Sequence, residues 1–309
     1  MAKGLPMTHT HTDSEQECFS VVEAVQRKLR TDGGFSGYLH AVTGVLAVEV
    51  FFLISILAGW GLKYFVWGNL ALIVAFALAW IGATLYPDLD NSKSTSHSAF
   101  GFIGEALSVV FRVSSSIIQT VVRTPKDDAS PNPHRGFYHT LLSAALIGAG
   151  VWFLTKLPQT FEVPLLGTLT LGQFFGALFL ASMIHLFLSS LGKKRMAKIR
   201  KGFAGEIVAF LIAVAVALLL INFIPAEHGY LWLGVAIAAG GATHILGDTF
   251  TRYGTPLFFP LTVLTKKRFW WYTRFGTIES GGEIEKVIVL ACSVLSALLF
   301  VAIVVLLAV

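Results

Sequence analysis

The sequence predicts an all-α, polytopic membrane protein: a helical bundle of about seven transmembrane helices. Of its 309 residues, 55% are apolar and only 13% are charged, which is about half the charged share of a soluble domain. The mean hydropathy is +0.71. The apolar residues occur in blocks of about 20, the length that a helix needs to cross the bilayer core. A membrane β-barrel would instead show alternating polarity.

Seven apolar blocks, rich in Leu, Ala, Val and Phe on all sides, are long enough to cross a membrane. In chain order they are residues 41–60, 66–86, 137–155, 168–192, 203–224, 231–249 and 287–309. A further stretch, 99–122, is also long enough but carries Glu105, Arg112 and a run of three serines. We expect an interfacial or re-entrant helix there. The alternative, an extra span, would move the neighbouring spans to opposite sides of the membrane.

The amino-terminal residues 1–37 differ from the rest of the chain. They are polar and of mixed charge, with no apolar segment typical of a signal peptide. We expect a cytoplasmic segment with a short amphipathic helix over about 15–30, followed by one integral membrane domain over 38–309. The two cysteines, Cys18 and Cys292, lie in these different regions and do not suggest a disulfide framework.

The distribution of basic residues predicts the orientation of the chain. All but two of the 23 Lys and Arg residues lie in the head or in segments 87–136, 193–201 and 250–286, which seven spans place on one side. Positive charge favours the cytoplasmic side, so we expect a cytoplasmic amino terminus, an external carboxyl terminus and an inner-membrane location. The basic loops are expected to contact anionic lipids, and nucleic acid is not an expected partner.

Residues capable of metal binding recur at the predicted cytoplasmic ends of the spans. His, Asp and Glu side chains from separate segments reach this face at similar depth: His40, Asp88, Asp90, His134, His139, His244, Asp248 and Glu283. Ionisable groups at membrane depth are costly and are usually paired or functional. Their convergence therefore predicts a common site near the inner leaflet.

The spacing within this set favours metal coordination. His244 and Asp248 are four residues apart and share one face of a helix. Pro87 ends the second span and can direct Asp88 and Asp90 into one cavity. Imidazole and carboxylate groups together suit zinc, manganese or iron, and carboxylates can bridge two such ions.

Each motif also has a simpler interpretation when it is taken alone. Asp88 and Asp90 can be ordinary solvated loop residues, and a histidine beside Arg135 can contact lipid head groups. A His-x-x-x-Asp pair at a helix end can be a hydrogen-bonded pair, and Glu283 can cap the last span. The joint occurrence of the motifs on one face is what favours metal binding.

With these motifs established, the chain resembles the YdjM-type membrane-bound metal-dependent hydrolases, some of which are described as LexA-regulated. The resemblance extends from about residue 38 to 288. It is carried by His40 with Gly44, Pro87-Asp88-Leu89-Asp90, His134-Arg135-Gly136-Phe137-Tyr138-His139-Thr140, His244-Ile245-Leu246-Gly247-Asp248, and the following "TFTRYGTPLFFP" and "SGGE". Two differences from the family pattern leave substrate choice open: Tyr138 stands where Thr is usual, and the segment before His134 is longer than in compact members.

Together these observations predict a metal-dependent hydrolase acting on a lipid phosphoester at the cytoplasmic leaflet. We expect at least one divalent ion and favour two, as in two-metal hydrolases. The expected metal is zinc or manganese. The predicted ligands are His40, Asp88, Asp90, His134, His139, His244 and Asp248. Arg135 is predicted to hold a phosphate oxygen, and Glu283 or an unligated Asp to orient the water or carry its proton.

Two alternatives remain open at this stage. One is a metal-binding transporter or ion pathway, and the other is a metal-stabilised membrane scaffold without turnover. The roles of Glu49 and His185, the oligomeric state and the substrate are likewise open.

Overall fold

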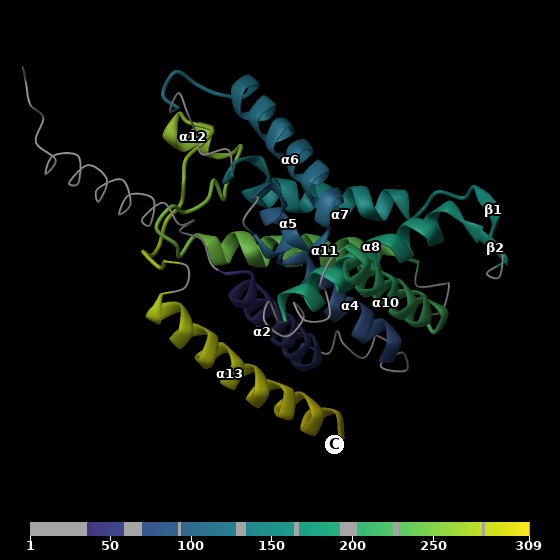
Figure 1. The fold of residues 1–309 in the computed structure, drawn as a ribbon. Coiled ribbons are helices and arrows are strands. Elements are labelled where there is room, and N and C mark those ends of the chain that lie inside the picture. The colour runs from purple at the N-terminus through teal and green to yellow at the C-terminus, as the bar shows by residue number, and fades with distance from the viewer. Residues whose placement is uncertain are drawn as a thin grey trace, which may run out of the picture. The chain divides into compact units, whose positions relative to one another are not determined.

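The structure, a computed structural model, describes residues 36–58, 70–91, 94–127, 134–163, 167–191, 203–224, 229–279 and 282–308. It is helical apart from one small hairpin (Figure 1), which confirms the predicted all-α membrane bundle. The compact unit that contains the bundle begins at Gly34. The predicted amphipathic helix of the head and the basic run 193–201 lie outside the described residues.

Within the described residues, six helical segments are long and apolar enough to cross a membrane. They are α2 (Gly37–Leu57), α4 (Leu70–Ala83) extended by the 3₁₀ helix η1 (Tyr86–Asp90), α8 (Leu171–Ser190), α10 (Phe203–Asn222), α11 (Leu231–Asp248) and α13 (Glu283–Ala308). Each overlaps one of the predicted spans. Short helices α5 (Thr95–Ala99) and α12 (Thr262–Lys266) lie in the connections.

The predicted third span, 137–155, is shorter than expected. Its helix, α7, covers only Leu141–Leu154, which is about 21 Å of helix against the ~30 Å of a bilayer core. The Thr140 side chain caps α7 by accepting from Ser143 N, and the residues before it form the 3₁₀ helix η2 (Phe137–His139). The first turn of the expected span is thus used to place His139.

The stretch 99–122 forms the amphipathic helix α6 (Gly101–Val121), which is not among the helices apolar enough to span. Its buried side carries the polar residues Ser108, Ser115 and Gln119, whereas Val113 and Ile117 on the other side are exposed. An exposed apolar face and a polar inner face are typical of a helix lying at the membrane interface.

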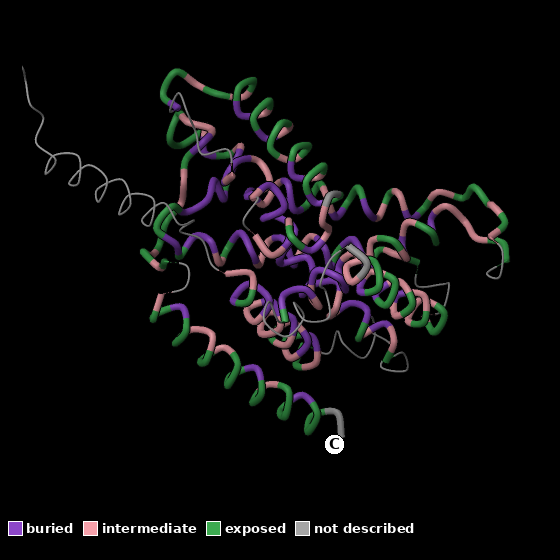
Figure 2. The backbone as a smooth tube through the Cα atoms, in the orientation of Figure 1, coloured by how far each residue is buried: buried purple, intermediate pink, exposed green. Residues whose placement is uncertain are grey.

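Helix α4 lies at the centre of the bundle and packs on α2, α8, α10 and α11. Figure 2 shows that buried residues are concentrated in this region. Small residues allow this contact, because Ala75, Ala79 and Ala83 are fully buried along α4. Gly82 approaches the Met183 backbone of α8, and a Cβ at that position would overlap it. By contrast, α13 lies along the outside against α2 and is mostly exposed (Figure 1).

Strands β1 (Thr160–Val163) and β2 (Gly167–Thr170) form an antiparallel hairpin between α7 and α8. Thr160 pairs with Thr170, and Val163 pairs with Gly167. The hairpin follows the end of α7 that is remote from η2 (Figure 1). The predicted spans leave 156–167 as a connection, whereas residues 168–170, predicted to begin the fourth span, belong to β2 instead.

Candidate metal centre

The predicted metal-binding residues meet because four helical elements present their ends on one side of the bundle. His40 lies in the first turn of α2, which Ser36 caps. Asp88 and Asp90 lie in η1, where Pro87 occupies the start of the 3₁₀ turn. The remaining members come from η2 and its preceding turn, and from the last turns of α11: His134, His139, His244 and Asp248.

Four of these residues form a compact set suited to one ion: Asp88, His139, His244 and Asp248. His244 Nε2 lies 3.3 Å from His139 Nε2. Asp88 Oδ1 lies 3.5 Å from His244 Nε2 and 3.6 Å from His139 Nε2. Asp248 Oδ2 lies at the same two distances from these nitrogens.

These spacings match a tetrahedral coordination shell. With zinc–ligand bonds of about 2.1 Å, the edges of a tetrahedron measure about 3.4 Å. Five of the six distances within the set are 3.3–3.6 Å, and all four atoms lie within 4.8 Å of one another. Two imidazole nitrogens facing each other between two buried carboxylates are also an arrangement that a cation stabilises. The residues therefore fit a divalent ion.

A hydrogen bond fixes the His244 ring for this purpose. Its Nδ1 lies 2.7 Å from the Thr84 carbonyl oxygen, which can only accept a hydrogen bond. The proton is therefore on Nδ1, and the Nε2 lone pair faces the set. The His139 imidazole is completely buried, and burial lowers its pKa below the ordinary value. His139 thus favours the neutral form that binds a metal, and His244 directs its Nε2 at the same point.

His40 lies directly beside the four-residue set. Its ring stacks on that of His244, with centroids 3.8 Å apart. His40 Nε2 is 3.6 Å from Asp248 Oδ1. His139 and His244 instead face the other oxygen of this carboxylate, Oδ2. His40 therefore contacts the four-residue set through Asp248. This position suits either a neighbour of the ion site or a ligand of a second ion site beside it.

Asp90 and His134 form a separate pair at the edge of the set. His134 Nδ1 lies 2.7 Å from Asp90 Oδ1, and His134 Nε2 lies 3.7 Å from Asp88 Oδ1. Burial alone would lower the pKa of His134, but the hydrogen bond to Asp90 and the charges of Asp90 and Asp88 raise it to about 9. The His134 side chain is 21% exposed, more than the His139, His244 and Asp248 side chains.

Arg135 is buried behind Asp248 rather than presented to an open cavity. Its Nη2 lies 3.3 Å from Asp248 Oδ1, and only 2% of the side chain is exposed. Its Nη1 donates to Thr251 Oγ1 at 2.6 Å and to the Gly254 carbonyl oxygen at 2.9 Å. These contacts favour a role in positioning Asp248, and none of them supports the predicted direct contact with phosphate.

The helix α6 supports both turns that carry the ligands. Phe137 N donates to Ser115 Oγ at 3.0 Å, and Ser108 Oγ donates to the Asp90 carbonyl oxygen at 3.3 Å. A Cβ on Gly136 would overlap the Ser115 and Gln119 side chains. Gly136 has a negative φ of −89°, so glycine is required there for close contact with α6 rather than for a left-handed turn.

The part of the chain that carries this site matches a known protein family. The family model for the YdjM inner membrane protein matches residues 36–194 and 207–309, which is most of the chain. The chain belongs to the YdjM family. No curated protein and no solved structure matches it. Membership of the YdjM family and the membrane-length helices together establish an inner-membrane protein.

One predicted site residue of this YdjM family member is not brought to the cluster. Glu283 lies in the first turn of α13 with 86% of its side chain exposed, and it accepts a hydrogen bond from Lys286 Nζ at 2.5 Å. The glutamate two residues later is the buried one. Glu285 Oε1 accepts from Ser36 N at 2.9 Å and so joins the start of α13 to the start of α2.

Glu49 and His185, whose roles the sequence left open, also lie away from the four ligands. Glu49 is partly buried in α2 on the side that packs against α13. His185 is buried in α8, and its Nε2 lies 2.7 Å from the Ala99 carbonyl oxygen. The sequence did not reveal the roles of Thr84 and Thr251, which hold His244 and Arg135. A backbone carbonyl leaves no motif, and Thr251 was visible only as one residue of the quoted "TFTRYGTPLFFP".

Proposed function

We propose that this protein is a membrane-embedded, metal-dependent hydrolase that cleaves a phosphoester of a lipid or lipid-like substrate at the cytoplasmic leaflet. The observation that carries the proposal is the tetrahedral set of Asp88, His139, His244 and Asp248, buried at the helix ends of a membrane bundle. Membership of the YdjM family is compatible with it.

Asp88, His139, His244 and Asp248 would hold the ion. A divalent ion in such a site acts as a Lewis acid and lowers the pKa of bound water toward ~7. Its identity is proposed as zinc or manganese from the donor types. One ion matches the single four-atom set found in the described residues; a second ion beside it would need His40 with Asp248 Oδ1, or His134 with Asp88.

The surrounding residues would orient the ligands and carry the proton. Arg135 holds Asp248 in place through its guanidinium group. Asp90 fixes the His134 ring through Nδ1, which leaves Nε2 directed toward Asp88. His134 Nε2 is therefore our candidate for giving a proton to the departing oxygen, in place of the predicted Glu283.

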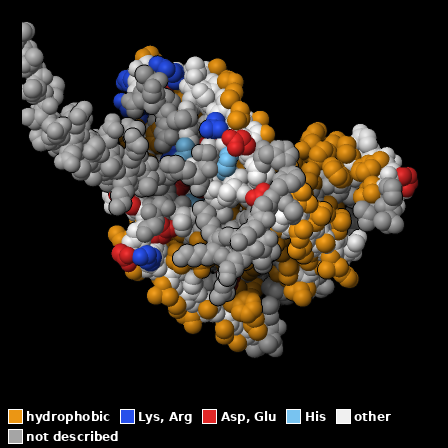
Figure 3. Space-filling view, viewed as in Figure 1, with side chains coloured by type: hydrophobic (Ala, Val, Ile, Leu, Met, Phe, Trp, Pro, Cys, Tyr) orange, Lys and Arg blue, Asp and Glu red, His pale blue; other side chains and the backbone are white. Residues whose placement is uncertain are grey.

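The location of the site favours a lipid substrate. Its ligands lie at the ends of membrane helices, at the depth expected for head groups. Exposed basic residues lie near α12: Arg123, Lys126, Lys266 and Lys267. Thr124 Oγ1 donates to the Lys267 carbonyl oxygen, which places these two loops together. Figure 3 shows Lys and Arg gathered there, whereas hydrophobic side chains dominate over α8 and α10. Such a basic surface attracts anionic head groups.

A metal-stabilised scaffold without turnover is the second candidate. One observation favours it, because four protein ligands in a tetrahedron are typical of structural zinc sites, whereas catalytic sites keep an open position. The donor types favour catalysis, because structural sites in proteins are dominated by cysteine and this set contains none. Of the two, the donor chemistry and the adjacent His134–Asp90 pair favour the hydrolase.

The deciding experiment measures metal content and then activity. We expect the purified protein to retain a divalent ion, and Asp88→Ala and His244→Ala to lose most of it. Full metal occupancy in both variants would refute the ligand set. A screen of phospholipids, isoprenoid phosphates and nucleotides then follows. Hydrolysis of a lipid phosphoester by the wild type, and not by the two variants, supports the enzyme. A metal-loaded protein that cleaves none of these substrates supports the scaffold.

A further inference from the structure

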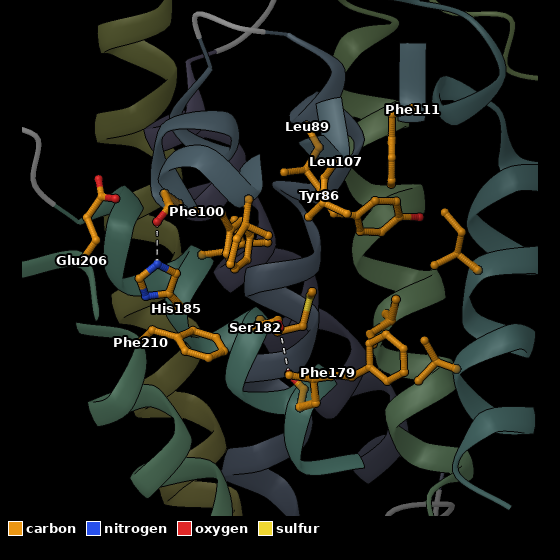
Figure 4. Close-up of a pocket in the computed structure, with 18 of the residues that line it drawn as sticks. Tyr86, Leu89, Phe100, Leu107, Phe111, Phe179, Ser182, His185, Glu206 and Phe210 are labelled. Atoms are coloured by element: carbon orange, nitrogen blue, oxygen red, sulfur yellow. Dashed lines mark hydrogen bonds between the residues drawn. The ribbon is translucent and has the colours of Figure 1, made fainter. Parts of the chain in front are cut away.

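An apolar cavity of about 730 Å³ lies inside the bundle next to the metal centre. Its volume is in the range of about 300–1,000 Å³ of small-molecule sites. Helices α6, α7, α8 and α10 provide most of its walls, with side chains such as Leu107, Phe111, Phe179 and Phe210 (Figure 4). The walls thus consist mainly of aliphatic and aromatic groups.

The cavity and the metal centre share two turns of the chain. Tyr86 and Leu89 line the cavity from η1, on either side of the ligand Asp88. Tyr138 lines it from η2, next to the ligand His139. Because the same two short turns carry both the ligands and part of the cavity wall, a molecule in the cavity contacts the turns that hold Asp88 and His139.

The cavity also reaches the outer surface of the bundle. The cavity is lined by four residues that are each 37–58% exposed: Ile103, Leu178, Ile207 and Leu211. They belong to α6, α8 and α10, and α8 and α10 have the length and hydropathy of membrane spans. In a bilayer this surface contacts lipid chains, so the cavity is continuous with the hydrocarbon region.

The polar groups of the lining do not suit a charged or sugar-like ligand. Ser182 Oγ donates to the Leu178 carbonyl oxygen of its own helix, and Tyr138 Oη is hydrogen-bonded to Ser114 Oγ. Glu206 and His185 lie together, away from Tyr86 and Leu89 (Figure 4). A head group would leave most of its hydrogen bonds unmade against such walls, whereas a hydrocarbon chain would not.

We propose that this cavity binds one hydrocarbon chain of the lipid substrate, which enters laterally between the helices and brings the phosphoester to the metal centre. The inference rests on the proposed function for the identity of the scissile bond, but chain binding itself does not depend on turnover. A lipid chain leaves one apolar environment for another, so the cavity gains little from the hydrophobic effect. Its contribution is selection by chain length and shape, through packing.

The test fills the cavity and measures chain binding directly. A phospholipid with a diazirine near the end of one acyl chain is incorporated into nanodiscs with the full-length protein. The nanodiscs are irradiated, and the peptides that carry the label are identified. We expect labelling at α8 and α10 in the wild type. Ser182→Phe should reduce it about tenfold, as expected for overpacking a filled site.

A matched control uses the same change on a different surface. Ser293 also donates to a carbonyl of its own helix, Val289 O at 2.7 Å, but it lies exposed on α13. Ser293→Phe should leave cavity labelling unchanged. If Ser182→Phe fails to fold, Ile147→Trp at the cavity wall replaces it, with the exposed neighbour Leu146→Trp as its control.

The outcomes separate this inference from the proposed function. Labelling that Ser182→Phe abolishes supports chain binding, whether or not the protein hydrolyses any lipid. Labelling that is unchanged in the filled variant, or scattered over the outer surface only, overturns chain binding even when lipid hydrolysis is observed. Absence of hydrolysis together with specific labelling refutes the enzyme and leaves the chain-binding cavity.

Discussion

At the scale of single residues, the metal centre divides its histidines and carboxylates into ligands and supporting groups. Asp88 and Asp90 are two residues apart in η1, yet only Asp88 belongs to the tetrahedral set. Asp90 instead binds His134 Nδ1. The His134–Asp90 pair therefore has the arrangement of a proton-carrying imidazole held by a carboxylate.

This division predicts the effect of replacing His134. His134→Ala should retain the metal content of the wild type but lower kcat by about 10²–10⁴-fold on whichever lipid phosphoester the protein cleaves. Asp90→Asn should reduce kcat less, because the ring keeps a hydrogen-bonding partner. Metal analysis and steady-state kinetics on the same preparations check both values.

The control for this experiment is His97→Ala. His97 lies outside the four-residue set, with its Nε2 4.0 Å from Glu105 Oε2, so its removal should change neither metal content nor kcat. If His134→Ala loses the ion, His134 is a ligand as the sequence first predicted, and its proposed proton transfer is wrong.

The sequence pointed to residues that the structure brings close together, but it could not show how they are arranged. The four members of the set are all among the predicted ligands, because helix-end positions and the His-x-x-x-Asp spacing are visible in one dimension. The direction in which Asp90 and Arg135 point depends on the packing of η1 and η2 against α6 and the loop after α11. Likewise, nothing in "GGEIEK" reveals that Glu285 is buried and Glu283 is exposed.

At the scale of the elements, contacts between small residues hold the ligand-bearing helices together. Helix α7, which follows the His139 turn, crosses α11, which carries His244 and Asp248. At this crossing Gly148 faces the Gly234 backbone, and a Cβ on Gly148 would also come within 2.7 Å of Ala238 Cβ. Helices in a membrane associate by such close packing rather than by the hydrophobic effect.

The Gly148→Ala variant tests this crossing. The added methyl group would push α7 away from α11, and we expect a loss of about 1–3 kcal/mol in stability. Thermal unfolding in detergent should show a lower Tm, and metal content should fall because His139 moves relative to His244. Both quantities are measured on the purified variant.

Gly150→Ala is the matched control on the same helix. A Cβ at Gly150 meets nothing within 4 Å, and alanine favours a helix over glycine by about 1 kcal/mol. Its Tm should therefore equal or exceed that of the wild type. Equal losses in both variants would mean that the close crossing of α7 and α11 does not stabilise the protein.

The sequence predicted most elements because long apolar blocks leave little choice of structure. It could not predict the short α7, since the capping of that helix by Thr140 depends on the 3₁₀ turn before it. It also missed the hairpin of β1 and β2, whose few residues show no strong alternation. The amphipathic character of α6 was visible from its charges and its serine run.

At the scale of the whole molecule, the metal centre lies at one end of the membrane helices only. The start of α2, the end of α4 with η1, the start of α7 and the end of α11 all contribute to it. A site built at one end of several spans acts on one leaflet only. The side on which it acts is therefore determined by the orientation of the chain, which the basic residues predict to be cytoplasmic for the site.

Two exposed lysines allow this orientation to be measured. Lys126 lies in the turn after α6, near α12, and Lys156 directly follows α7 at the end remote from His139. In a variant with both native cysteines replaced by serine, each lysine is changed in turn to cysteine. The variants are treated with a membrane-impermeant maleimide in intact spheroplasts and after lysis.

We expect Lys156→Cys to react in intact spheroplasts and Lys126→Cys only after lysis, because basic loops remain on the cytoplasmic side. Retained metal content in each variant serves as the control that the bundle has folded. The reverse pattern would place the ligands at the external leaflet. The substrate would then be a lipid of that leaflet, and the basic surface near Lys126 would not face the anionic cytoplasmic lipids that the proposal assigns to it.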